Sequence, residues 1–464
     1  MLSKKKIHFE ISERKVLLRI FDVFSVLSAL YLVGIVFKFD YFYIAPANYY
    51  WTVVLSLYLM IFGTIFEMYN LQVASTESQM IKSIVLTVAI TVLTYLLTPI
   101  YTPLLPKKRI QILFFFLAIL IALFIWRYVY LKLFASHRFQ KKVVLIVDSE
   151  NVKEQILGLE IVDPHYKVVA VVQVNADLEN VAFTEFRKSI AIDQLQHFVT
   201  QNQISEIVVA TQNTNSITVV LYNQLIELLE KGFSIREYSH VYESITQRIP
   251  VQYLASDFYR YFPFSRSNQN RLYLLVVKVL EIAISLLGLL LGLGLLPLLF
   301  IFNLLWNEGP MFYTQERVGK NGTVFKILKL RTMIVNAESD KAVFAAVNDH
   351  RITPFGKFLR KTRIDELPQF INVLKGEMAV IGPRPERPII VAAISKEMPF
   401  YETRHVIKPG LTGWAQVNFS YGESIEDSLI KLQYDLYYIK HRSIFLDINI
   451  CIKTLSTVLF FRGQ

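Results

Sequence analysis

The chain has 464 residues, of which 53% are hydrophobic, and a formal net charge of +11 at pH 7. A chain of this size with so apolar a composition is not an ordinary soluble protein, which indicates a membrane protein. Its basic residues lie beside apolar segments rather than in a low-complexity arm, which favours anionic lipids and phosphorylated substrates over nucleic acid as partners. The single cysteine, Cys451, excludes disulfides within the chain and cysteine-rich zinc sites.

Four apolar segments fill the first third of the sequence, and each is close to the roughly 20 residues that cross a bilayer core. They cover residues 16–37, 49–68, 81–101 and 110–133. We expect a four-helix transmembrane bundle within residues 1–140, whose first segment is an anchor rather than a cleaved signal peptide. Basic residues at 4–6 and between 132 and 142 predict that both ends of the bundle face the cytoplasm, although residues 107–109, Lys-Lys-Arg, then lie on the outer side.

Residues 141–245 change to short β-branched runs separated by helical stretches, which is typical of a doubly wound α/β domain with buried parallel strands. The runs lie at 143–147, 168–172 and 206–210, and the clearest helix covers 216–231. The first run is followed by D-S-E-N-V from Asp148, with no glycine. The dinucleotide fingerprint needs glycines at that turn, so we expect a Rossmann-like domain without a nicotinamide cofactor.

A polar, aromatic-rich connector at 246–270 leads into the last domain, 271–464, which begins with an apolar segment at about 272–306. If this segment spanned the membrane, everything after it would lie outside the cell. Pro297 lies past its middle and removes a helix hydrogen bond, so a helix-break-helix that enters and leaves by one face is physically available. We therefore expect a re-entrant hairpin with its break at Pro297.

The apolar C-terminal stretch, residues 444–461, contains Asp447 and Lys453. It is short for a membrane span, and its charges favour a partly buried helix at the membrane interface.

An adjacent acid pair, Asp365 and Glu366, lies in the string N-D-H-R-I-T-P-F-G-K-F-L-R-K-T-R-I-D-E-L-P-Q-F-I-N-V-L-K-G-E-M-A-V-I-G-P-R-P-E at 348–386. Five basic residues of this string surround the pair: Arg351, Arg360, Lys361, Arg363 and Arg384. Arginine forks match phosphate oxygens, so the pair could divide two tasks, one carboxylate attacking phosphorus and the other holding a divalent cation. Alternatively, the acids merely complement the N-terminus of the helix predicted after Pro368.

This string resembles the signature of the bacterial sugar transferase family of phosphoglycosyl transferases. The resemblance extends to G-P-M-F-Y-T-Q-E-R-V-G-K-N-G at 309–322, F-K-I-L-K-L-R-T-M at 325–333 and K-P-G-L-T-G-W-A-Q-V-N at 408–418. It implies a large monotopic member with a transmembrane bundle, a degenerate Rossmann-like domain, a re-entrant membrane hairpin and a mainly α catalytic domain on the cytoplasmic face of the bacterial inner membrane. The family often has Ser before the hairpin proline, where this chain has Leu296.

The resemblance also implies a reaction. The enzyme would transfer a sugar 1-phosphate from a UDP-sugar to undecaprenyl phosphate and release UMP, as the first membrane step of exopolysaccharide, capsule or O-antigen-type assembly. Asp365 would be the nucleophile that forms an aspartyl phosphosugar, and Glu366 would hold Mg²⁺; spacing alone does not distinguish the two acids. Glucose, galactose and N-acetylhexosamines all stay open as the sugar. The oligomeric state stays open as well, although family members of this size are often dimeric, which makes a homodimer one of the candidate states.

Cations of the matched motifs complete the predicted substrate site. Arg360 would hold phosphate oxygens, and Arg384 would contact nucleotide or phosphate from a backbone that Pro383 and Pro385 lock on either side. Lys329 and Arg331 alternate with apolar neighbours, which predicts that one strand face presents both cations to a phosphate, unless that face is plain solvated surface. Arg317, from the motif at 309–322, belongs to the same predicted set.

Two other functional classes compete with this reading. A nucleotide-sugar oxidoreductase or dehydratase built on the α/β domain is disfavoured because the glycine loop is missing. A non-catalytic membrane scaffold of a polysaccharide assembly complex is opposed only by the intact acid pair.

Overall fold

The computed structural model describes residues 11–37, 39–69, 74, 77–134, 141–148, 151–160, 166–174, 187–211, 217–251, 270–307, 309–335, 350–398, 400–419 and 424–459. The chain forms two compact units, Met1–Thr246 and Gln247–Gln464. Most of the predicted connector, residues 252–269, lies outside the described residues.

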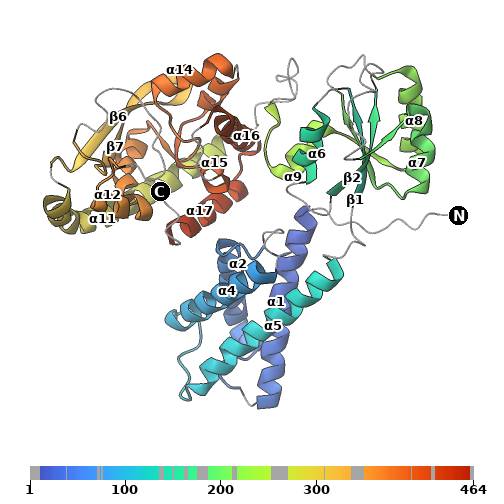
Figure 1. Cartoon of the computed structure of the whole chain (residues 1–464). Coiled ribbons are helices and arrows are strands. Elements are labelled where there is room, and N and C mark those ends of the chain that lie inside the picture. The colour runs from blue at the N-terminus through green and yellow to red at the C-terminus, as the bar shows by residue number, and fades with distance from the viewer. Residues whose placement is uncertain are drawn as a thin grey trace. The chain divides into compact units, whose positions relative to one another are not determined.

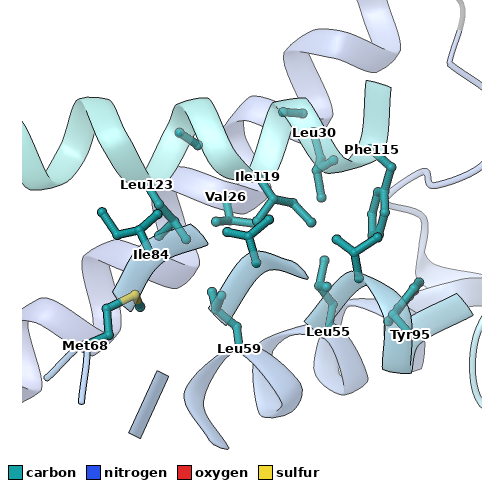
Figure 2. Packing of buried hydrophobic residues seen from close by; sticks show 14 of the residues in the cluster. Val26, Leu30, Leu55, Leu59, Met68, Ile84, Tyr95, Phe115, Ile119 and Leu123 are labelled. Atoms are coloured by element: carbon teal, nitrogen blue, oxygen red, sulfur yellow. The ribbon is translucent and has the colours of Figure 1, made fainter. Parts of the chain in front are cut away.

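The first unit begins with four long helices: α1 (Ile11–Phe37), α2 (Tyr49–Ile65), α4 (Glu77–Leu97) and α5 (Ile110–Phe134). They confirm the four helices expected from the apolar segments. Buried side chains from all four, such as Leu30, Leu55, Tyr95 and Phe115, form one core (Figure 2). Many large apolar side chains point outward instead, which suits helices that contact lipid. By length and composition, each of these helices could cross a membrane.

The α/β domain follows in the same unit. Its described part holds a sheet in the order β3-β2-β1-β4-β5, in which every pair of neighbours is parallel. The strands are β1 (Lys141–Val147), β2 (Tyr166–Gln173), β3 (Lys188–Ile190), β4 (Glu206–Ala210) and β5 (Ser234–Glu237). Helices α6 (Val152–Glu160) and α9 (Tyr238–Thr246) lie on one side of the sheet, and α7 (Leu195–Gln201) and α8 (Val219–Glu230) lie on the other (Figure 1). The three predicted parallel strands are confirmed, and the sequence pattern missed the two short edge strands.

The second unit is mainly helical and opens with α11 (Arg271–Trp306). An antiparallel hairpin of β6 (Phe312–Val318) and β7 (Val324–Leu330) follows. The remaining elements are α12 (Pro354–Thr362), the 3₁₀ helix η11 (Ile364–Gln369), α13 (Phe370–Lys375), β8 (Ala379–Ile381), α14 (Pro388–Glu397), η12 (Tyr401–Val406), β9 (Gly410–Thr412), α15 (Trp414–Asn418), α16 (Ile425–His441) and α17 (Ile444–Leu459). Figure 1 labels α12, α14, α15, α16 and α17. The largest core of this unit surrounds the fully buried Trp414.

Helix α11 runs unbroken through Pro297, so the predicted interruption between two helices is wrong for this structure. A proline inside a helix removes one hydrogen bond and can bend the axis without ending the helix. The buried positions of α11 are separated by 12, 3, 11 and 4 residues, which brings them to one side of the helix: Tyr273, Ser285, Gly288, Leu299 and Asn303. The other faces expose large apolar side chains. A surface helix of a soluble protein exposes polar side chains and buries apolar ones, so this opposite pattern suits a helix whose outer faces meet lipid.

Helix α17 confirms the partly buried helix predicted at the C-terminal end. It buries Ile450 and exposes Phe445 and Ile448. Asp447 in its first turn accepts hydrogen bonds from Tyr273 of α11 (2.6 Å) and from Tyr438 of α16 (2.7 Å). These bonds join the two apolar helices within one unit.

Candidate active site

A tight turn delivers the acid pair. Thr353 begins α12 by accepting a hydrogen bond from the Gly356 amide (2.9 Å). The helix ends at Arg363, whose φ of +59° lies in the left-handed region. This backbone conformation costs a non-glycine residue roughly 1–3 kcal/mol, and such strain is often found at functional sites. The turn at Arg363 places Asp365 and Glu366 in the first turn of η11.

Glu366 collects the cations of the site. Its Oε1 accepts hydrogen bonds from Arg384 Nη2 (3.1 Å), Lys329 Nζ (3.3 Å) and Arg363 Nη1 (3.5 Å). Burial alone would raise the pKa of Glu366, but the positive charges of Arg384, Lys329 and Arg363 outweigh burial and hold the pKa well below its usual range. Glu366 is therefore a permanent anion that fixes three cations around one oxygen.

Asp365 has the opposite environment. It is 7% exposed, and its Oδ1 is buried without a hydrogen-bond partner among the described residues. Burial, and then the negative charge of Glu366, raise the pKa of Asp365 to about 6. At pH 7 the group is mostly ionised and keeps one carboxylate oxygen that no described side chain satisfies. This is the state a carboxylate nucleophile needs.

The turn at 383–386 holds Arg384 in place. Each of its four consecutive carbonyl oxygens accepts a hydrogen bond. The pairs are Pro383 O with Gly410 N (2.8 Å), Arg384 O with Arg404 Nη2 (3.0 Å), Pro385 O with Arg317 Nη1 (3.1 Å), and Glu386 O with Val318 N (2.9 Å). The backbone that presents the Arg384 guanidinium to Glu366 is thus tied to three other segments of the unit.

Arg404 is a residue of this site that the sequence reasoning missed. Its guanidinium is buried and bonds Asp435 Oδ2 (2.7 Å) and Tyr401 Oη (2.6 Å) as well as the Arg384 carbonyl. Asp435 lies 31 residues further along the chain, on α16. A pair so far apart leaves no local spacing signal, so only folding could reveal it.

Lys329 and Arg331, which were predicted to lie on one strand face, make different contacts. Lys329 contacts Glu366, whereas Arg331 is buried and donates to the carbonyl oxygens of Pro310 (2.7 Å), Met333 (2.9 Å) and Asn307. Strand β7 ends at Leu330, and the amide of Arg331 still donates a hydrogen bond to the Met311 carbonyl (2.8 Å). These bonds hold the chain just after α11.

Arg360 and Arg317 make contacts with different segments near the acid pair. Arg360, in the last turn of α12, bonds Thr332 Oγ1 (2.9 Å), and its charge helps to lower the pKa of Asp365. Arg317 supports the 383–386 turn and lies 3.6 Å from Glu386 Oε2. The structure therefore brings Lys329, Arg363 and Arg384 onto the acid pair directly, while Arg317 acts on the backbone beside it.

The acid pair can be tested for its fit to Mg²⁺. Within the described part of the chain, no three His, Cys, Asp or Glu side chains gather as a metal site. Magnesium does not require such a group, because it is commonly held by one or two carboxylates together with substrate phosphates and water. The second oxygen of Glu366, which accepts none of the three bonds above, fits that mode.

Comparison with known proteins gives a consistent result. Residues 272–461 match the family model described as bacterial sugar transferase. The chain is 49% identical over 153 residues to the UDP-N-acetylgalactosamine-undecaprenyl-phosphate N-acetylgalactosaminephosphotransferase of Aeromonas hydrophila, a stretch that covers 33% of this chain and 36% of that protein. It is 46% identical over 141 residues to a Bacillus subtilis protein with the provisional name undecaprenyl-phosphate N-acetylgalactosaminyl 1-phosphate transferase, covering 30% of this chain and 79% of that protein.

A third relative is the UDP-glucose:undecaprenyl-phosphate glucose-1-phosphate transferase of Xanthomonas campestris, 41% identical over 193 residues, which are 40% of each chain. The matched stretch thus spans less than half the length of the Aeromonas and Xanthomonas relatives.

Proposed function

Because the chain belongs to the bacterial sugar transferase family, we propose that it transfers a sugar 1-phosphate from a UDP-sugar to undecaprenyl phosphate and releases UMP. The observation that carries the proposal is the buried, unpartnered carboxylate oxygen of Asp365 beside a glutamate that gathers three cations. Burying an anion with an unsatisfied oxygen costs free energy. The arrangement is suited to nucleophilic attack, because neighbouring cations can hold a phosphorus electrophile for that oxygen.

The reaction has two steps at one phosphorus. In the first, Asp365 attacks the phosphorus that bears the sugar, the bond to the UMP oxygen breaks, and UMP leaves with the electron pair. In the second, an oxygen of undecaprenyl phosphate attacks the same phosphorus and the acyl-phosphate bond breaks. This restores the Asp365 carboxylate and yields the lipid diphosphate sugar.

The cations next to the acid pair perform the electrostatic part. Lys329, Arg363 and Arg384 meet at Glu366, so their charges are already in place when a diphosphate arrives. The backbone on both sides of Arg384 is fixed by hydrogen bonds. Glu366 would hold Mg²⁺, which when bound neutralises the diphosphate and the leaving group.

The catalytic unit belongs on the cytoplasmic face of the bacterial inner membrane in this proposal, and α11 does not span. The support comes from contacts along α11. Tyr273 in its first turn bonds Asp447, Glu281 accepts from the Val380 amide (3.3 Å), and Asn307 just past its end donates to the Arg331 carbonyl (2.9 Å). If α11 crossed the bilayer, the charged groups packed along it would enter the hydrocarbon core, at a cost of several kcal/mol.

The test is lipid-dependent release of UMP. The purified protein is mixed with Mg²⁺, undecaprenyl phosphate and, one at a time, UDP-glucose, UDP-galactose and the UDP-N-acetylhexosamines. We expect UMP release with at least one sugar, and a protein adduct with the mass of that sugar phosphate when lipid is omitted. Asp365→Asn should remove both signals. Activity retained in that variant would exclude the nucleophile, and no UMP from the wild-type protein with any sugar would favour the scaffold.

A further inference from the structure

The face of α11 that meets the catalytic unit is built from small and polar residues. Glu281, Ser285, Gly288 and Gly292 follow one another at intervals of three or four residues, so they lie on one side of the helix. This side packs against η11, which carries the acid pair, and against α13, which follows it. Contacts between small residues and a neighbouring helix let two backbones approach closely.

Gly288 is the tightest point of this contact. A Cβ atom at Gly288 would lie 2.2, 2.5 and 2.7 Å from three ring atoms of Phe370, distances that non-bonded carbons do not adopt. The ring therefore occupies the space that a side chain at 288 would fill. Phe370 is the first residue of α13, five positions after Asp365.

Two other glycines of α11 allow the contact at Gly288 to be compared with looser ones. A Cβ at Gly292 would lie 3.9 Å from the Cβ of Leu367, which is ordinary van der Waals contact. A Cβ at Gly294 would meet nothing within 4 Å among the described residues. The three glycines share one helix and differ only in what faces them.

We propose that Gly288 is a positioning residue for catalysis: its missing side chain lets the Phe370 ring seat on α11 and so sets where η11 holds Asp365 above the lipid-facing helix. The proposal rests on the proposed function. To reach 3.4 Å, the start of ordinary contact, the Phe370 ring would have to move by about 1.2 Å relative to an alanine at 288. A shift of that size at the start of α13 would change the distance between Asp365 and the phosphorus that it attacks.

The competing explanation is that glycine at 288 has no specific role and the ring can swing aside. In that case, alanine at any of the three positions would act alike. Alanine favours a helix over glycine at each of them, so a general effect would be mildly stabilising everywhere. If the contact with Phe370 matters, the loss of activity should instead be largest at Gly288, where the added Cβ lies closest to another side chain, and smallest at Gly294, where it meets nothing.

The experiment is the series Gly288→Ala, Gly292→Ala and Gly294→Ala, assayed for lipid-dependent UMP release with kcat and KM determined separately. We expect Gly294→Ala and Gly292→Ala to stay within about twofold of the wild-type kcat. A misplacement of about 1 Å at a reacting group can cost about 100-fold, so Gly288→Ala should lose on the order of 100-fold in kcat with the KM for UDP-sugar unchanged.

A second-site variant separates misplacement from misfolding. Phe370→Leu shortens the side chain that would collide, so adding it to Gly288→Ala should recover at least 10-fold of the lost kcat. Failure of that rescue, or a Gly288→Ala enzyme as active as Gly294→Ala, overturns the proposal. Both results require an active wild-type enzyme. Absence of UMP release from the wild type would instead refute the proposed function, so the two failures are distinguishable.

Discussion

Replacing the proposed nucleophile should stabilise the protein while it removes activity. Asp365 is held as a buried anion beside the negative charge of Glu366, and its Oδ1 has no hydrogen-bond partner among the described residues. Its folded state therefore carries an electrostatic cost that the unfolded chain does not. The Asp365→Asn variant keeps the shape of the side chain and removes the charge.

The size of this effect follows from the pKa of Asp365, about 6 in the fold against an ordinary value of 3.8. Each pH unit of difference corresponds to 1.36 kcal/mol, so the full cost is about 3 kcal/mol. Because folding raises the pKa of Asp365, the free-energy cost of its charge is absent below the pKa of the unfolded state. The cost is complete above the pKa of the folded state. Asp365→Asn should therefore gain up to about 3 kcal/mol near pH 7.5, but only about 1 kcal/mol near pH 4.5.

Thermal unfolding in detergent, with EDTA present to exclude bound cations, measures this difference. For a unit of this size, about 3 kcal/mol corresponds to a rise in Tm of roughly 6–12 °C near pH 7.5. The increment should shrink by more than half near pH 4.5. A variant that is no more stable than wild type near pH 7.5, or one whose gain is the same at both pH values, would refute the electrostatic reasoning.

Three further predictions follow from the site and the membrane helices. Formation of the protein–phosphosugar adduct should fall as pH drops through about 6, because Asp365 must be ionised to attack; Glu366→Gln removes the adjacent negative charge and should move this limb to lower pH. If the pH at which adduct formation falls is the same in the variant and the wild type in single-turnover assays, Glu366 does not raise the pKa of Asp365. A truncated protein comprising 266–464 should still bind membranes and retain some lipid-dependent UMP release, and complete loss despite good folding would show that the first unit contributes to the site. Single cysteines at the exposed positions Glu230 and Lys396, in a background without the native cysteine, should both resist an impermeant thiol reagent in intact cells and react after lysis. Labelling of the Lys396 site alone in intact cells would show that α11 spans.

The bundle and the sheet were predictable because each depends on a local pattern. An apolar run of bilayer length has to satisfy its backbone hydrogen bonds internally, so α1, α2, α4 and α5 follow from the sequence within a few residues. Short β-branched runs separated by helices predict parallel strands for the same kind of reason, since buried strands are apolar on both faces. The edge strands β3 and β5 were missed because three and four residues are too short to show a pattern.

The acid pair was also recognisable in advance, but the spacing of the residues did not distinguish its two acids. Asp365 and Glu366 are neighbours with the same chemistry, and only the fold surrounds one with Lys329, Arg363 and Arg384 and leaves an oxygen of the other unpartnered. These partners come from segments up to 37 residues away, whose meeting depends on packing rather than on spacing.

The sequence by itself determined which segments are apolar enough for a membrane, where the three central parallel strands lie and which residues carry the charges of the acid motif. Tertiary structure alone decided that α11 continues through Pro297, that Arg331 bonds backbone carbonyl oxygens just after α11, and that Arg404 reaches from Asp435 to the Arg384 carbonyl. Helix and strand formation respond to neighbours within a few residues, so they can be read along the chain. The residue that contacts a buried charge, or that packs against a helix glycine, depends on which distant segment of the chain lies there.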